Sequence, residues 1–296
     1  MNEFSHTPVM LEEVIAHLDP APGGVYADVT LGGGGHARAI LQRSAPDGRL
    51  VGTDRDPVAL RAAGAALREF GDRATLRKAR IHELRRVLDE LEIDRVDGVI
   101  ADLGVSSAQL DRSERGFSLA TEGPIDMRMD QTDAETALDL IARCDAETLA
   151  DLIYEYGEER RSRRIARSLK QAYEEGRLET TTDLKRAVHR ATGPKRGRID
   201  PSTRTFQALR IAVNEELTDL AAFLDSLPGI LKLGGVVTVI SFHSLEDRMV
   251  KHRFRDSAEL DPITKRPMVP SEEERERNPR SRSAKLRAAR RLQVTA

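Results

Sequence analysis

The segment at residues 24–37, GVYADVTLGGGGHA, decides the fold. Its first seven residues predict a β-strand, and its four consecutive glycines lead into a predicted helix over residues 36–43. Glycine permits positive φ angles and lets a ligand approach the backbone closely. A glycine-rich turn between a strand and a helix is typical of sites for nucleotide-like cofactors, although a merely flexible turn is the alternative. No Gly-Lys-Ser/Thr follows, so the turn is not a P-loop.

Strand-like and helix-like stretches alternate on both sides of this segment. Further strands are predicted over residues 49–54, 74–78, 96–103 and 236–242, and further helices over residues 57–70, 81–91 and 205–231. Alternation of this kind indicates βαβ units on a parallel sheet. We therefore expect an α/β fold whose ligand lies at the carboxyl edge of the sheet.

The alternation stops in the middle of the chain. Residues 111–202 are almost wholly helical or loop-like and contain no convincing buried strand. We expect a discontinuous α/β domain over residues 1–110 and 203–296, interrupted by a helical insertion over residues 111–202. The tail after about residue 257 is rich in proline and charge, and we expect it to be poorly packed except where it meets a partner.

The composition is that of a core-forming protein of the reducing cytoplasm. Hydrophobic residues make up 39% of the 296 residues, and Cys144 is the only cysteine, so no disulfide can form within the chain. No stretch approaches the roughly 20 apolar residues that span a bilayer. The N-terminus has neither the basic start nor the apolar core of a signal peptide. We expect a cytoplasmic location and no membrane partner.

Positive charge is concentrated in two blocks. Residues 158–204 contain 14 Lys or Arg against 7 Asp or Glu, and residues 275–291 contain 8 against 1, although the whole chain has a net charge of −2. Such blocks are often ordinary solvated helix faces. Two of them on an otherwise acidic chain favour a polyanionic partner, because clustered Lys and Arg bind phosphates.

Polar residues at the strand ends indicate which cofactor is bound. Asp54 ends the second strand, where a carboxylate binds ribose hydroxyls in NAD and S-adenosylmethionine sites alike. Asp28 precedes Gly32 in the pattern D-x-x-x-G-x-G, where it would repel a pyrophosphate but attract the ammonium group of S-adenosylmethionine. The fourth strand ends in DLGVSSAQ at residues 102–109, and the last strand runs into SFHSLEDR at residues 241–248. Together these strand ends favour S-adenosylmethionine.

Two other kinds of site are poorly supported. His6, His36 and His243 lack the i, i+4 spacing of a zinc-binding helix, and no thiolate accompanies them, so we expect no metal. A serine hydrolase would need a G-x-S-x-G elbow, which the sequence lacks.

Ten motifs occur in an order that resembles the bacterial 16S ribosomal RNA cytosine-N4 methyltransferase family, from residue 5 to about residue 290. Any one of them alone is weak, but ten in order are specific. They are SHTPVML (5–11), TLGGGGHA (30–37), DRDP (54–57), DLGVSSAQLD (102–111), RGFS (115–118), DMRMD (126–130), YGEER (156–160), TRTFQALRIAVNEEL (203–217), SFHSLEDR (241–248) and NPRSRSAKLRA (278–288).

The resemblance implies a class I (Rossmann-like) methyltransferase fold with a helical insertion. It implies transfer of a methyl group from S-adenosylmethionine to the exocyclic N4 of a cytidine in the decoding region of 16S rRNA. The partner would be 16S rRNA within the small ribosomal subunit, whereas the oligomeric state, monomer or homodimer, stays open. Together with Asp28 and Gly32, the implied cofactor-binding residues are Gly34, Gly35, His36, Asp54, Ile81, Asp102 and Gln109.

The sequence departs from the family pattern at two positions. Ala108 follows the double serine where relatives commonly have proline, which loosens the loop without removing a functional group. Relatives often have a Gly-x-Phe type segment at the adenine, whereas this chain has KARIH at residues 78–82. Ile81 is therefore the least certain contact.

The candidate catalytic residues follow from the chemistry of N4, whose lone pair is delocalised into the ring. A hydrogen-bond acceptor at N4 would favour the nucleophilic amine and then receive its proton. Asp102 is the leading candidate and His243 the second, while Ser106 and Ser107 would orient the base. The basic insertion and the Arg-rich tail would bind phosphates around a base splayed out of its stack.

Three other functions remain open. A DNA cytosine-N4 or adenine-N6 methyltransferase would usually have a Pro-Pro-aromatic turn after the fourth strand, where this chain has LGVS at residues 103–106. A nicotinamide-dependent oxidoreductase would explain the glycine turn but not Asp28 or the SFHSLEDR segment. A non-catalytic RNA-binding protein would not explain the density of polar groups at the strand ends.

Overall fold

The structure is a computed structural model that describes residues 8–193 and 200–293. It divides into two compact units, one of residues 1–104 and 217–296 and one of residues 105–216. The sequence placed the boundaries after residues 110 and 202 instead. No helix in the described residues is long and apolar enough to cross a membrane.

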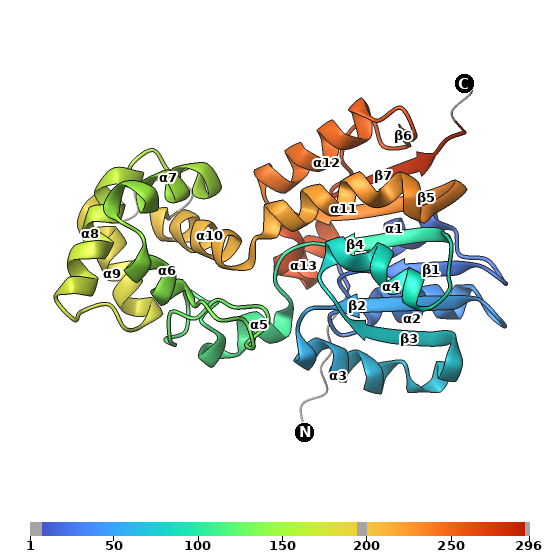
Figure 1. The fold of residues 1–296 in the computed structure, drawn as a ribbon, viewed down its shortest axis with the longest axis horizontal. Coiled ribbons are helices and arrows are strands. Elements are labelled where there is room, and N and C mark those ends of the chain that lie inside the picture. The colour runs from blue at the N-terminus through green and yellow to red at the C-terminus, as the bar shows by residue number, and fades with distance from the viewer. Residues whose placement is uncertain (1–7, 194–199, 294–296) are drawn as a thin grey trace. The chain divides into compact units, whose positions relative to one another are not determined.

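The first unit is built on a seven-stranded sheet with the order β3-β2-β1-β4-β5-β7-β6. In Figure 1 the strands follow one another in this order from the bottom of the view to the top. Strands β3 to β5 are parallel, and β7 is antiparallel to both β5 and β6. The strands are β1 Val25–Asp28, β2 Arg49–Asp54, β3 Ala74–Lys78, β4 Val96–Asp102, β5 Leu231–Ser241, β6 Leu260–Pro262 and β7 Lys285–Arg291. The predicted α/β fold, with a Rossmann-like, mainly parallel sheet, is confirmed.

Helices cover both faces of this sheet. Along β4, Val99 and Ala101 belong to one hydrophobic core, whereas Ile100 belongs to the core on the other face. This alternation is the period of two that a buried strand imposes. The first core includes residues of α4 Leu84–Glu90, α11 Glu216–Ile230 and α12 Ser244–Asp256, and the second includes residues of α1 Leu11–Leu18, α2 Gly35–Arg43 and α3 Pro57–Ala66.

The C-terminal segment was expected to be poorly packed, and this expectation is wrong. It contains α13 Glu272–Arg277 and the strands β6 and β7, and Leu286, Ala288 and Ala289 of β7 are buried. β7 pairs with the whole second half of β5. The strand was missed because its sequence, KLRAARR, is dominated by charge, and only pairing beside β5 buries its few apolar side chains.

A second correction concerns the helix predicted over residues 205–231. It is two helices, α10 Pro201–Asn214 and α11, separated at Glu215, whose φ of 52° lies in the left-handed region. Phe206 and Leu209 of α10 belong to the core of the helical unit. The predicted helix therefore crosses from one unit into the other.

The second unit is helical, and its loop at residues 115–130 is held by buried polar side chains. The guanidinium of Arg115, only 2% exposed, donates to the carbonyls of Arg128 and Met129 at 3.1 and 2.8 Å. Asn214 accepts from the Met129 N–H and donates to the Met127 carbonyl. The RGFS and DMRMD motifs thus have a structural role. The helices are α5 Ser107–Asp111, α6 Ala137–Arg143, α7 Ala146–Gly157, α8 Ser162–Glu174, α9 Thr181–Thr192 and α10.

Candidate functional site

Three aspartates end three neighbouring strands of the sheet. Asp28 is the last residue of β1, Asp54 of β2 and Asp102 of β4. These strands are parallel and adjacent in the order β2-β1-β4, so their carboxyl ends lie along one edge. The structure thus places the three aspartates of the sequence prediction at the edge where α/β sheets bind ligands.

The environment of these carboxylates opposes their negative charge. Burial, with a further contribution from Asp54, raises the pKa of Asp28 to about 7, although the Thr30 N–H donates to it at 3.1 Å. Burial also raises the pKa of Asp54 to about 6, even though it accepts N–H groups from Gly32 at 2.9 Å and Asp56 at 2.8 Å. A ligand that carries positive charge would offset this repulsion, whereas a pyrophosphate would add to it.

The glycine turn has an open part and a packed part. Gly32 (φ 52°) and Gly34 (φ 82°) both need the left-handed region, which glycine adopts without strain. A Cβ at Gly33 would meet no atom of the described residues within 4 Å, so among these residues there is room for a ligand at the turn. A Cβ at Gly34 would lie 3.3 Å from Cα of Ala63, and one at Gly35 would collide with Pro8. A larger residue would therefore not fit at Gly34 or Gly35, and a cofactor there would contact the backbone of these two glycines.

His36 begins the first turn of α2 and is almost fully buried. Its Nε2 lies 3.0 Å from the Val9 carbonyl, so that nitrogen carries the proton and donates it. Its Nδ1 lies 3.9 Å from Oδ2 of Asp102. The histidine therefore connects the N-terminal segment to the end of β4.

Asp102 has the properties of a proton acceptor. Its backbone N–H donates to Oγ1 of Thr30 at 2.5 Å, and its Oδ1 is buried without a hydrogen-bond partner among the described residues. Burial, and then the charges of Asp28, Glu246 and Glu274, raise its pKa well above the ordinary range. A carboxylate of raised pKa is a stronger base.

His243 is already engaged, as the N-cap of α12. Its Nε2 lies 3.1 Å from Oε1 of Glu246, and the other oxygen of Glu246 accepts the N–H groups of Phe242 and His243 at 2.8 and 3.2 Å. Glu246 is 2% exposed and was passed over in the sequence as one of several polar residues. The capping-box spacing from His243 to Glu246 is the signal that could have found it.

Ile81 lies in a short 3-10 helix, Ile81–Glu83, that follows β3. The two residues beside it contact the buried Asp219 of α11. Nε of Arg80 lies 2.7 Å from Oδ2 of Asp219, and Nδ1 of His82 lies 2.8 Å from its Oδ1. Asp219 is a further residue that the sequence reading missed, because nothing in its neighbourhood in the chain marks it. These contacts fix the turn on which Ile81 lies.

Ser106, Ser107 and Gln109 belong to the helical unit. Ser106 is the N-cap of α5, and its Oγ accepts the Gln109 N–H at 3.3 Å, while Oε1 of Gln109 accepts the Ser106 N–H at 3.0 Å. Ser107 is the first residue of that helix. These reciprocal bonds give Ser106 and Gln109 a capping role.

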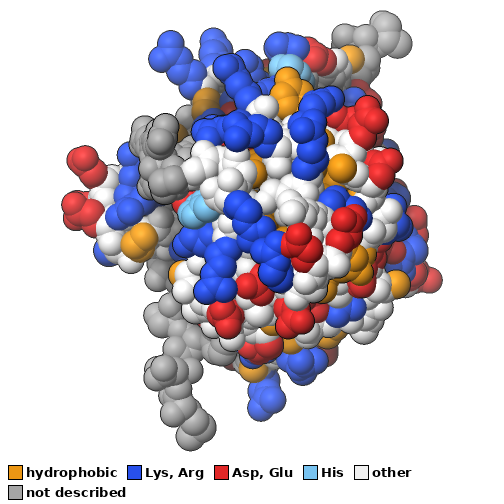
Figure 2. Space-filling view, turned by 90° about the vertical axis from the view of Figure 1, so that its left-hand side faces the viewer, with side chains coloured by type: hydrophobic (Ala, Val, Ile, Leu, Met, Phe, Trp, Pro, Cys, Tyr) orange, Lys and Arg blue, Asp and Glu red, His pale blue; other side chains and the backbone are white. Residues whose placement is uncertain are grey.

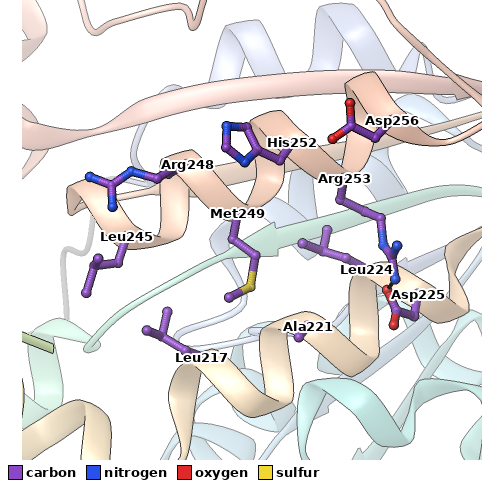
Figure 3. A pocket seen from close by; sticks show the side chains of 10 residues that line it. All are labelled: Leu217, Ala221, Leu224, Asp225, Leu245, Arg248, Met249, His252, Arg253 and Asp256. Carbon is purple, nitrogen blue, oxygen red and sulfur yellow. Dashed lines mark ion pairs between the residues drawn. The ribbon is translucent and has the colours of Figure 1, made fainter. Parts of the chain in front are cut away.

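A groove of about 480 Å³ lies elsewhere in the first unit, between α11 and α12 (Figure 3). Its floor includes Leu217, Leu224 and Met249, and Arg253 forms an ion pair with Asp225 across it. None of the predicted cofactor residues lines the groove. We therefore place the candidate site at the three aspartates.

Comparison with known proteins identifies the family. The family profile described as "MraW methylase family" matches residues 3–292. The chain belongs to this family. The methylase is 56% identical to ribosomal RNA small subunit methyltransferase H of Sorangium cellulosum over 97% of this chain and 91% of that protein. It is 50% identical to the protein of the same name from Geobacter sulfurreducens over 98% of this chain and 99% of the relative. The solved structure of TrmN from Thermus thermophilus aligns at 13% identity and a TM-score of 0.47, covering 98% of this chain and 50% of that one.

A methylase needs a methyl donor. The predicted donor, S-adenosylmethionine, is confirmed as the cofactor of this family. The residues present fit it. The open turn at Gly33 leaves room for the ligand, and the buried carboxylates of Asp28 and Asp54 suit a molecule that carries a cationic sulfonium and an ammonium group.

Proposed function

We propose that the protein methylates the exocyclic N4 of a cytidine in the decoding region of 16S rRNA. The substrate class rests on the relatives' printed name, which specifies small-subunit ribosomal RNA. The observation that carries the chemistry is the buried Oδ1 of Asp102, which lacks a protein partner among the described residues and belongs to a carboxylate of raised pKa.

The cofactor is proposed to lie along the carboxyl edge of β2, β1 and β4. The carboxylate of Asp54 would accept the ribose hydroxyls, since the N–H groups of Gly32 and Asp56 already hold it in place. The carboxylate of Asp28 would face the ammonium group. Bound S-adenosylmethionine supplies an electrophilic methyl group. We assign eight residues of this unit to binding it: Asp28, Gly32, Gly34, Gly35, His36, Asp54, Ile81 and Asp102.

Asp102 would act on the amino group of the substrate. Its free carboxylate oxygen would accept a hydrogen bond from N4–H, which concentrates the lone pair on nitrogen. That lone pair would form the bond to the methyl carbon as the carbon–sulfur bond breaks and leaves its electron pair on sulfur, and the N4 proton would pass to Asp102. His243 is the less favoured base, because its ring already lies against Glu246.

Binding of rRNA is assigned to the helical unit. Figure 2, which turns the side of the helical unit toward the viewer, shows Lys and Arg side chains gathered in the middle of the face. On α8, Ile165, Ala166 and Leu169 face the core, which leaves Arg163, Arg164 and Arg167 exposed. Phosphate contacts of this type bind RNA without reading its sequence. The part of the basic block at residues 194–199 lies outside the described residues.

The Arg-rich C-terminal segment contributes less to this surface than its sequence suggests. Lys285 and Arg287 bind Asp247 at 3.0 and 2.7 Å, which ties β7 to α12. Arg291 donates to the Leu231 carbonyl. Three of its basic side chains therefore stabilise the fold, and Arg277, Arg282 and Arg290 are exposed and available for phosphates.

A labelled methyl-transfer assay on unmodified small subunits tests the proposal, with mass mapping of the product nucleoside. We expect one N4-methylated cytidine in the decoding region, and no label with Asp102→Asn. Methylation of a different base or atom would contradict the N4 assignment. Binding of S-adenosylmethionine and rRNA without any transfer would instead indicate a non-catalytic protein.

A further inference from the structure

The N-terminal segment before α1 contacts helix α13 beside the candidate site. Oε1 of Glu274, on the C-terminal helix α13, accepts the backbone N–H of Met10 at 2.7 Å. Met10 has a φ of 52°, a left-handed conformation that a non-glycine residue keeps only when its surroundings hold it. Its side chain is 1% exposed, and its carbonyl accepts the N–H of Val14 in the first turn of α1. Glu274 is thus one of the contacts that hold Met10 in this conformation.

The same peptide group reaches the site from its other side. The N–H of Met10 and the carbonyl of Val9 belong to one planar peptide unit, and in the trans form they point in opposite directions. Glu274 binds the N–H, and the Val9 carbonyl accepts a hydrogen bond from Nε2 of His36 at 3.0 Å. A carboxylate that binds the N–H polarises the peptide and strengthens its carbonyl as an acceptor.

This bond determines which nitrogen of His36 carries the proton. A carbonyl only accepts, so Nε2 must be the donor, and the neutral ring then has its unprotonated nitrogen at Nδ1. Nδ1 is the atom that lies 3.9 Å from Oδ2 of Asp102. The tautomer of His36 therefore decides whether Asp102 faces a basic nitrogen or an N–H.

We propose that Glu274 is a positioning residue for His36. Through the Val9–Met10 peptide, α13 holds the imidazole in the Nε2–H form and directs its basic nitrogen toward Asp102. The consequence for catalysis rests on the proposed function, in which Asp102 accepts the N4 proton. The effect on the histidine does not rest on it, because it concerns the protein alone.

Nitrogen NMR of histidine-labelled protein without cofactor tests the inference, with the His36 signals assigned by their loss in His36→Gln. We expect the Nε2–H tautomer to predominate in the unsubstituted protein and in Glu274→Gln, whose amide oxygen still accepts the Met10 N–H. In Glu274→Ala the tautomer ratio should fall about twofold, because the Val9 carbonyl loses the polarisation that the carboxylate supplied through the peptide. The matched control is Glu273→Ala, which removes an exposed glutamate from the same first turn of α13.

An unchanged tautomer in Glu274→Ala, or an equal change in Glu273→Ala, would overturn the inference. Methyl transfer gives the second readout: kcat should fall by up to about twofold in Glu274→Ala with little change in KM for RNA, and recover in Glu274→Gln. If the tautomer shifts as expected but no variant transfers methyl, the inference about Glu274 stands and the proposed function fails. If kcat falls equally in both Glu274 variants, Glu274 does not act through its hydrogen bond.

Discussion

Asp102 has a buried carboxylate oxygen that makes no hydrogen bond to the described residues, and it lies near His36. Asp102→Asn keeps the shape but removes the basic oxygen, so we expect kcat for methyl transfer to fall by about 10²–10⁴. Single-turnover assays at saturating cofactor measure this, with the exposed Asp72→Asn as control. In the unsubstituted protein, kcat should also fall as the pH drops below the raised pKa of Asp102, because the protonated carboxyl cannot accept. Normal transfer and normal cofactor affinity in Asp102→Asn would contradict both roles given to this residue.

Asp28 should make the stability of the cofactor-free protein depend on pH. Its pKa is about 7 in the folded state and near 3.8 when exposed, so the folded state binds the extra proton between these values. The protonated Asp28 carboxyl therefore makes its full contribution to the free energy of unfolding below pH 3.8. This contribution is lost as the pH rises through 7. Asp28→Asn removes the charge, and we expect it to stabilise the protein by about 2–4 kcal/mol at pH 8 and by almost nothing at pH 4. Urea unfolding at both pH values checks this, and an equal effect at both would contradict it.

At the scale of elements, the C-terminal strand β7 completes the sheet that forms the site. It pairs with β5 along residues 285–290, and its Lys285 and Arg287 hold Asp247 in the first turn of α12. The helix α13, which carries Glu274, lies between β6 and β7 in the chain. The C-terminal segment is thus part of the first unit, on which the candidate site lies.

Removing a buried side chain from β7 should destabilise the protein. Leu286 is fully buried, so Leu286→Ala should lower the free energy of unfolding by about 2–5 kcal/mol. Leu292 is 43% exposed just beyond the strand, and Leu292→Ala should change it by less than about 0.5 kcal/mol. Denaturant unfolding compares the two variants. Equal and small effects would mean that the tail is loosely attached in solution.

In the whole molecule, each unit has its own proposed function. The residues proposed to bind the cofactor lie on the sheet of the first unit, and the basic surface proposed to bind RNA lies on the helical unit. Arg160, Arg164 and Arg167 are exposed, and no ion pair joins them to other described residues, whereas Arg161 donates to the Thr192 carbonyl. The first three are therefore better placed than Arg161 to bind phosphates.

Reversing these three charges to glutamate should weaken binding to rRNA or to the small subunit by at least about tenfold at 0.15 M salt. The salt dependence of binding should become shallower, since fewer counterions are released. Affinity for S-adenosylmethionine, measured by calorimetry, should not change. The matched control reverses three exposed arginines of the first unit, Arg43, Arg61 and Arg68. Equal loss of RNA and cofactor binding would indicate misfolding instead.

The α/β class, the glycine turn and the positions of Asp28, Asp54 and Asp102 at strand ends were all predictable from the sequence. These follow from local patterns, because a period of two, a glycine run and a polar residue after an apolar strand are all visible within a few residues. The strand character of the C-terminal segment, the division of the 205–231 helix at Glu215 and the contacts of Glu246, Asp219 and Glu274 became visible only in the folded protein. The physical reason is distance along the chain: burial of β7 needs β5, and Glu274 meets Met10 across 264 residues. The glycine turn marks the site, and segments far from it in the sequence complete its surroundings.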